Sequence, residues 1–181
     1  QAVRWWETGR DPFAPKKAAE IASPSLWTTL ESALSTRGLP PEQRLAALIL
    51  QDLWGNRIDL SYAISQSHGS AWTDEDLLVD HHATAVEHLL ARRGGDVHVV
   101  HDNTGTELAV DFALVDALLD TVANRVIMHV KIHPTFVSDA IVPDIWHLLD
   151  AMPEGEPRAL RDRLLAAFES GRLRLAPDAY W

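Results

Sequence analysis

The sequence predicts an α/β fold in which helices precede and flank a small parallel β-sheet. Three observations support this prediction. The first half of the chain repeats apolar residues at helical spacing, the second half contains short β-branched runs, and helical segments separate these runs. Strands that alternate with helices are typical of a parallel sheet with right-handed crossovers.

Three helices are expected before the first strand. The first, over 23–38, begins with a serine cap followed by proline and ends at glycine. The second, over 40–55, begins with two prolines and again ends at glycine. We therefore expect the residues 54–61 (WGNRIDLS) to form a polar corner between helices, and the third helix to cover 80–93.

The second half alternates between two periodicities. Strands are expected over 97–101, 125–130 and 173–175, and helices over 106–123, 142–151 and 157–170. The pattern predicts a Rossmann-like parallel sheet core. We expect a helical portion (1–94) and an α/β metal-binding core (95–181) within one continuous domain. Because the chain begins with Gln1 and stops just after the last strand, we expect a domain truncated at both ends.

The composition excludes several classes of partner and of catalytic chemistry. Lys and Arg number 16 against 26 Asp and Glu, which leaves a net charge of −10 and argues against a nucleic-acid partner. The absence of cysteine excludes disulfides, thiol nucleophiles and cysteine metal sites, and fits a cytoplasmic location. The longest apolar run, 45–50, is far shorter than the roughly 18 residues of a membrane span, so no membrane partner is expected.

Polar side chains follow the first two predicted strands. Asp102 and Asn103 come directly after the first strand, and Asp139 lies in the loop after the second. Ligands of open parallel sheets bind at the carboxyl ends of the strands, and two carboxylates with an amide oxygen suit a hard divalent cation. Ordinary turn chemistry and helix capping are the alternative reading of the same residues. The helix that begins near Thr106 would add N–H donors for an anion.

Other catalytic patterns are missing from the sequence. The nine histidines show no HExxH spacing, and there is no G-x-S-x-G elbow and no Walker A loop. The segment after the first strand holds one glycine, Gly105, where a dinucleotide or S-adenosylmethionine site of the usual kind has several. Tryptophans near the ends of the chain (Trp5, Trp6 and Trp181) favour self-association.

Two families resemble parts of this sequence. The run 99–107 (VVHDNTGTE) superficially resembles the D-x-T-G-T box of haloacid dehalogenase-type phosphatases. Three separated blocks, 53–61 (LWGNRIDLS), 102–111 (DNTGTELAVD) and 129–139 (HVKIHPTFVSD), together resemble the damage-control phosphatase family, most closely its sugar-phosphate branch. The blocks follow the order found in that family, and this second resemblance covers most of the chain.

The resemblance implies a metal-dependent phosphatase that hydrolyses phosphomonoesters of sugars or damaged phosphometabolites. It implies that Asp102, Asn103 and Asp139 hold a divalent metal (Mn, Mg, Co or Ni) and carry catalysis. Substrate-binding residues carried over from the same blocks are Asn56, Arg57, Asp59, Glu107, Asp111 and Lys131. The family's Lys-Gly-Asp phosphate-binding segment is not found after the last predicted strand.

Two other functions stay open at this point. Carboxyl methyl transfer from S-adenosylmethionine has been proposed for relatives in this family, although the glycine loop is lacking. The chain could also be an inactive fragment or binding module, because the expected sheet is incomplete. Sequence alone does not decide whether Asp102 attacks phosphorus or only binds the metal.

Overall fold

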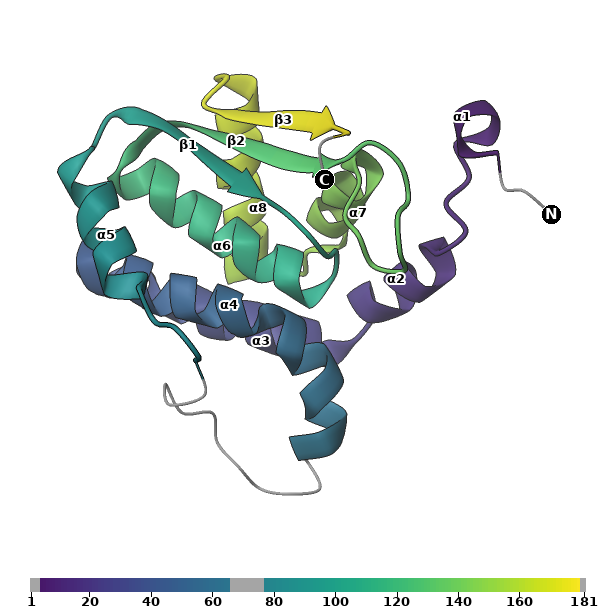
Figure 1. Cartoon of the computed structure of the whole chain (residues 1–181), viewed down its shortest axis with the longest axis horizontal. Coiled ribbons are helices and arrows are strands. Elements are labelled where there is room, and N and C mark those ends of the chain that lie inside the picture. The colour runs from purple at the N-terminus through teal and green to yellow at the C-terminus, as the bar shows by residue number, and fades with distance from the viewer. Residues whose placement is uncertain (1–3, 66–76, 180–181) are drawn as a thin grey trace.

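The computed structural model describes residues 4–65 and 77–179, with side chains for all of these except 54–65 (Figure 1). A three-stranded sheet lies against one layer of helices, and further helices pack on the far side of that layer. The predicted α/β class, with its helical N-terminal portion and parallel sheet, is confirmed. No helix in the described ranges is long and apolar enough to cross a membrane.

The N-terminal half is helical. Its elements are α1 (Trp5–Thr8), α2 (Ala14–Ile21), α3 (Pro24–Leu34), the 3₁₀ turn η1 (Ser35–Gly38), α4 (Pro41–Ser65) and α5 (His82–Ala91). The helix predicted over 23–38 is therefore an α-helix that tightens into a 3₁₀ turn before the glycine. Pro24 occupies its first turn, where the missing N–H of proline costs nothing.

The predicted polar corner over 54–61 is wrong. The backbone of these residues continues α4, which runs for 25 residues to Ser65. A single glycine in a helix interior costs only about 1 kcal/mol relative to alanine. Gly55 therefore does not end a helix that is well formed on its N-terminal side.

The C-terminal half forms the sheet and its crossovers. Its elements are β1 (Gly95–Val100), α6 (Thr106–Thr121), β2 (Ala123–Lys131), α7 (Val142–Ala151), α8 (Glu156–Glu169) and β3 (Leu173–Asp178). The strands lie in the order β1-β2-β3, and both neighbouring pairs are parallel. The bounds of α7 match the prediction, whereas β3 extends three residues past the predicted run.

Helix α6 forms the centre of the molecule. Leu108, Phe112 and Val115 are completely buried, as are side chains on its other faces, because the sheet covers one side of α6 and α3 and α4 cover the other (Figure 1). A helix that is apolar on all sides is typical of such a buried position. Its N-terminus lies beside the ends of β1 and β2, so the core fixes the edge of the sheet where the polar residues gather.

Candidate functional site

The loops after β1 and β2 are joined by main-chain hydrogen bonds. The carbonyl oxygen of Asp102 accepts from the N–H of Ala140 at 2.7 Å, and Asn103 forms an isolated antiparallel bridge with Asp139. Parallel strands end at the same edge of a sheet, and here the two loops pair further beyond that edge. The pairing brings residues 102 and 139 together although 37 positions separate them.

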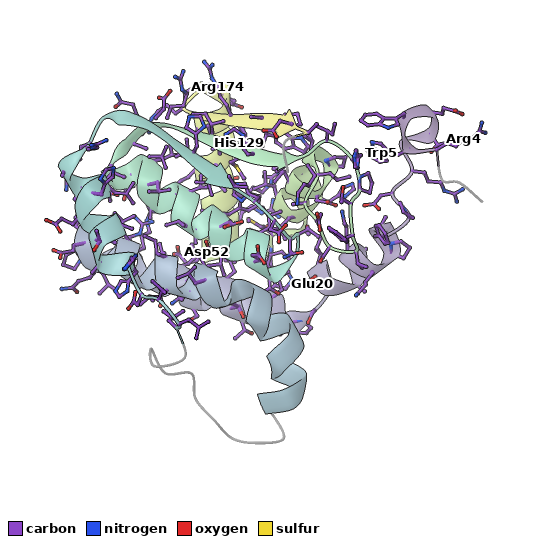
Figure 2. All side chains as sticks on the ribbon, viewed as in Figure 1. Arg4, Trp5, Glu20, Asp52, His129 and Arg174 are labelled. Carbon is purple, nitrogen blue, oxygen red and sulfur yellow. The ribbon has the colours of Figure 1, made fainter. Side chains whose placement is uncertain are left out.

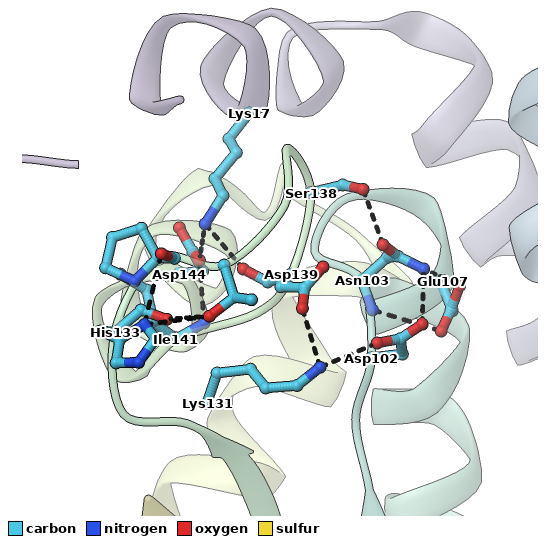
Figure 3. A network of polar contacts seen from close by, with 12 residues as sticks. Lys17, Asp102, Asn103, Glu107, Lys131, His133, Ser138, Asp139, Ile141 and Asp144 are labelled. Carbon is cyan, nitrogen blue, oxygen red and sulfur yellow. Dashed lines mark hydrogen bonds and ion pairs between the residues drawn. The ribbon is translucent and has the colours of Figure 1, made fainter. Parts of the chain in front are cut away.

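Two carboxylates converge on one ammonium group at this edge (Figure 3). The Nζ atom of Lys131, at the end of β2, lies 3.1 Å from Oδ1 of Asp102 and 2.8 Å from Oδ2 of Asp139. The Asp139 side chain is 6% exposed, whereas that of Asp102 is 58% exposed. One carboxylate is therefore fixed inside the protein and the other faces solvent, and both reach a single cationic atom.

The charge of Lys131 is held by these contacts. Burial would lower its pKa, but the hydrogen bonds to Asp139 and Asp102 outweigh burial, so that the pKa lies above its usual value. Lys131 therefore stays protonated across the neutral range and balances the two acidic side chains.

Asn103 is held by a second set of contacts. Its side-chain nitrogen donates to Oε2 of Glu107 at 3.1 Å and to Oδ2 of Asp102 at 3.3 Å, while its amide oxygen accepts from the hydroxyl of Ser138 at 2.6 Å (Figure 3). Burial raises the pKa of Glu107. The amide oxygen of Asn103 thus faces away from Asp102, and ligation of a cation by this oxygen requires the amide to turn.

Asp111 lies behind the site rather than at its surface. Its carboxylate is buried and accepts from Nδ1 of His101 at 2.5 Å. It also shares a hydrogen bond with the carboxyl of Asp52, on α4. Burial raises the pKa of Asp52 to about 9 and that of Asp111 to about 7, and it lowers the pKa of His101 to about 4.

The direction of these shifts favours one arrangement of protons when Asp111 is ionised. His101 is neutral and donates from Nδ1, and the protonated Asp52 donates to the carboxylate of Asp111. The cluster supports His101, the residue immediately before Asp102. Sequence reasoning missed Asp52 and His101 in this role, although Asp52 falls on the apolar face of its helix, where an acidic side chain is unusual.

The N-terminal helix α2 also reaches the site, and sequence reasoning missed this too. The Nζ atom of Lys17 donates to the carbonyl oxygen of Asp139 at 2.8 Å. The first N–H of α6, that of Thr106, donates to Oε1 of Glu20 at 2.8 Å (Figure 2 labels Glu20 beside this end of α6). The sequence predicts that the start of this helix offers N–H donors to an anion, and Glu20 already uses one of them.

The remaining predicted substrate-binding residues have side chains that the structure does not describe. Asn56, Arg57 and Asp59 belong to α4, but their side chains are outside the described part of the structure. Their role therefore stays a prediction. Among the described side chains no three His, Asp or Glu residues form a metal-binding group, so the candidate set reaches three donors only with the Asn103 amide.

The fold and this edge of the sheet define an α/β protein with acidic and amide side chains after two adjacent parallel strands. A family model, the damage-control phosphatase ARMT1-like domain, matches residues 2–181. The chain belongs to this family, as its sequence predicts.

Two curated relatives are similar to this chain. The damage-control phosphatase ARMT1 of Danio rerio is 31% identical over 123 residues, which make up 58% of this chain and 28% of the relative. That of Xenopus laevis is 33% identical over 120 residues, or 57% of this chain and 27% of the relative. The matched stretch thus spans little more than a quarter of these relatives.

Proposed function

We propose that this chain is a metal-dependent phosphatase that hydrolyses phosphomonoesters of sugars or damaged phosphometabolites. Membership of a damage-control phosphatase family supports phosphatase chemistry. The observation that carries the proposal further is the convergence of the Asp102 and Asp139 carboxylates on one cationic atom at the carboxyl edge of the sheet.

The residues at this edge fit a divalent cation such as Mn²⁺, Mg²⁺, Co²⁺ or Ni²⁺. Carboxylate oxygens of Asp102 and Asp139 and the amide oxygen of Asn103 would hold it, and hard oxygen donors are what these ions accept. When bound, the ion supplies Lewis acidity toward a phosphoryl oxygen and lowers the pKa of a bound water. A chain of net charge −10 also needs local positive charge to admit an anionic substrate.

The protein's own residues prepare the site in distinct ways. The paired loops bring Asp102 and Asp139 together, whereas Glu107 and Ser138 hold the Asn103 amide in an orientation from which it must turn to bind the cation. Lys131 supplies a fixed positive charge beside both carboxylates, where a phosphoryl group would gain negative charge in the transition state. The exposed carboxylate of Asp102 is suited either to ligation or to direct attack on phosphorus, and trapping of an acyl phosphate on Asp102 distinguishes the two.

Phosphate release tests the proposal. The full chain is assayed against a panel of sugar phosphates with each of the four metals, alongside Asp102→Ala and a control, Asp150→Ala, whose side chain is 76% exposed. We expect release that a chelator abolishes, a loss of about 10³-fold or more in Asp102→Ala, and full activity in Asp150→Ala. Equal release by the Asp102 variant, or none by the folded protein with any metal, would contradict the proposal.

A further inference from the structure

Helix α2 presents two charged side chains to the candidate site from one face. Lys17 and Glu20 are three positions apart, which places them side by side on a helix. We propose that they are positioning residues that set the distance between Asp102 and Asp139 and so the affinity of the site for metal. This inference rests on the proposed function.

Lys17 fixes the loop that carries Asp139. Its side chain is 4% exposed, and Nζ lies 3.0 Å from Oδ2 of Asp11. Nζ also lies 2.6 Å from Oδ2 of Asp144 and 2.8 Å from the carbonyl oxygen of Asp139 (Figure 3). An ammonium buried between two carboxylates is costly to displace, because movement leaves an unpaired charge inside the protein. The main chain of Asp139 is thereby tied to α2.

Asp144 adds a second restraint on the loop that carries Asp139. The same Oδ2 atom that pairs with Lys17 accepts from the N–H of Ile141 at 3.0 Å. The loop is therefore held at the carbonyl of residue 139 and, through Asp144, at the N–H of residue 141. These two contacts restrain the backbone on which the Asp139 carboxylate stands.

Glu20 fixes the other loop. Its Oε1 atom accepts from the N–H of Thr106, and a Cβ atom placed on Gly105 would lie 2.0 Å from this oxygen, so the carboxylate packs directly on the loop that follows Asp102 and Asn103. One helix thus restrains both loops. Both side chains act on main-chain atoms, which distinguishes them from residues that would touch metal or substrate.

Metal affinity of the full chain tests this inference. Binding of Mn²⁺ is titrated by its electron paramagnetic resonance signal in the unmodified protein, in Lys17→Met and in the control Lys16→Met, which changes an exposed lysine of the same helix. We expect Kd for Mn²⁺ to rise at least about 10-fold in Lys17→Met and to be unchanged in the control. Excess Mn²⁺ should restore kcat, and KM for the substrate at saturating metal should stay the same.

Further variants keep the test decisive. Asp144→Asn breaks the ion pair but keeps an oxygen for the N–H of Ile141, and it replaces Lys17→Met if that variant fails to fold. Glu20→Ala should also weaken Mn²⁺ binding, because the loop after Asp102 loses its contact with α2. Unchanged Kd in folded variants would overturn the inference alone. Failure of the unmodified protein to bind Mn²⁺ would overturn the proposed function and this inference with it.

Discussion

At the scale of single residues, we expect the acidic cluster behind the site, Asp52 and Asp111, to make the stability of the fold depend on pH. Asp52 keeps a proton in the folded protein because burial raises its pKa to about 9, whereas its ordinary value is 3.8. Between about pH 4 and pH 9 the unfolded chain releases this proton and the folded chain retains it. Folding then binds a proton, so this group's contribution to stability is complete below pH 4 and declines as the pH rises.

Replacement of Asp52 by asparagine should remove this decline, because the amide stays neutral at every pH. In urea unfolding at pH 5 and pH 8.5, we expect the unmodified protein to lose more stability between the two pH values than Asp52→Asn, by about 1 kcal/mol or more. Asp150→Asn, at an exposed position, should retain the original slope. Equal slopes in the unmodified protein and Asp52→Asn would show that Asp52 is ionised in the folded protein.

At the scale of elements, the start of α6 is the most constrained junction near the site. Gly105 has φ of +80°, a region that side chains with a Cβ atom rarely adopt, and Glu20 packs directly on it. The following helix is buried on every side, so the junction cannot relax by moving the helix. The loop with Asp102 and Asn103 is therefore fixed at both of its ends.

A comparison of Gly105→Ala with Gly171→Ala separates the cost of a positive φ from the cost of the clash with Glu20. Gly171 also has positive φ, +72°, but a Cβ atom there would meet nothing closer than 3.9 Å. We expect Gly171→Ala to cost about 1 kcal/mol in urea unfolding and Gly105→Ala to cost at least about 1 kcal/mol more. Combining Gly105→Ala with Glu20→Ala should recover part of that excess, and strictly additive effects would contradict direct packing of the two residues.

At the scale of the whole molecule, one buried aspartate links the N-terminal and C-terminal halves. Asp116 of α6 pairs with Arg37 of η1 at 2.7 Å, with Arg44 of α4 at 2.9 Å and with Arg163 of α8 at 2.8 Å. Three elements thus meet around a carboxylate that is itself almost inaccessible to solvent. Truncation of that carboxylate would leave several cationic groups without their shared partner.

We expect Asp116→Ala to lower the free energy of unfolding by about 3–5 kcal/mol, because breaking a buried ion pair leaves charge uncompensated. Asp120→Ala removes another partner of Arg44, but the Asp120 side chain is 55% exposed, so its loss should cost about 0–1 kcal/mol. Urea denaturation of both variants measures the difference. Similar small losses in both would mean that Asp116 does not join the two halves.

The sequence predicted those parts of the fold that depend on local pattern. The β-branched runs indicated β1 and β2, and the helix predicted over 142–151 has the bounds observed for α7. It also predicted that residues after two strands would meet, because parallel strands end at one edge. The extent of α4 through Gly55 was missed, since the cost of one glycine is small against the rest of that helix.

The parts that sequence reasoning missed depend on distant pairing. Lys17 and Asp144 are 127 positions apart, and Glu20 and Thr106 are 86 apart. Nothing in the sequence of the short helix α2 indicates which of its two lysines, Lys16 or Lys17, is buried. The same applies to Asp52 and Asp111, whose shared proton arises only when α4 and α6 pack together.

One exposed aromatic side chain bears on the predicted self-association of the chain. Trp6 is 72% exposed, which is consistent with the predicted self-association, and sedimentation velocity over a range of concentrations measures it. We expect Trp6→Ser to reduce any concentration-dependent increase in sedimentation coefficient, and an unchanged dependence would show that Trp6 is not in the contact.

The stoichiometry of Mn²⁺ binding to the full chain and to Asp139→Asn decides whether Asp102 and Asp139 share a metal site. Asp139 is nearly inaccessible to solvent and asparagine has its shape, so the change removes one charge with little effect on packing. We expect one Mn²⁺ bound per chain, and loss of that binding in Asp139→Asn while the variant stays folded. Undiminished binding by Asp139→Asn would contradict a metal site shared by Asp102 and Asp139.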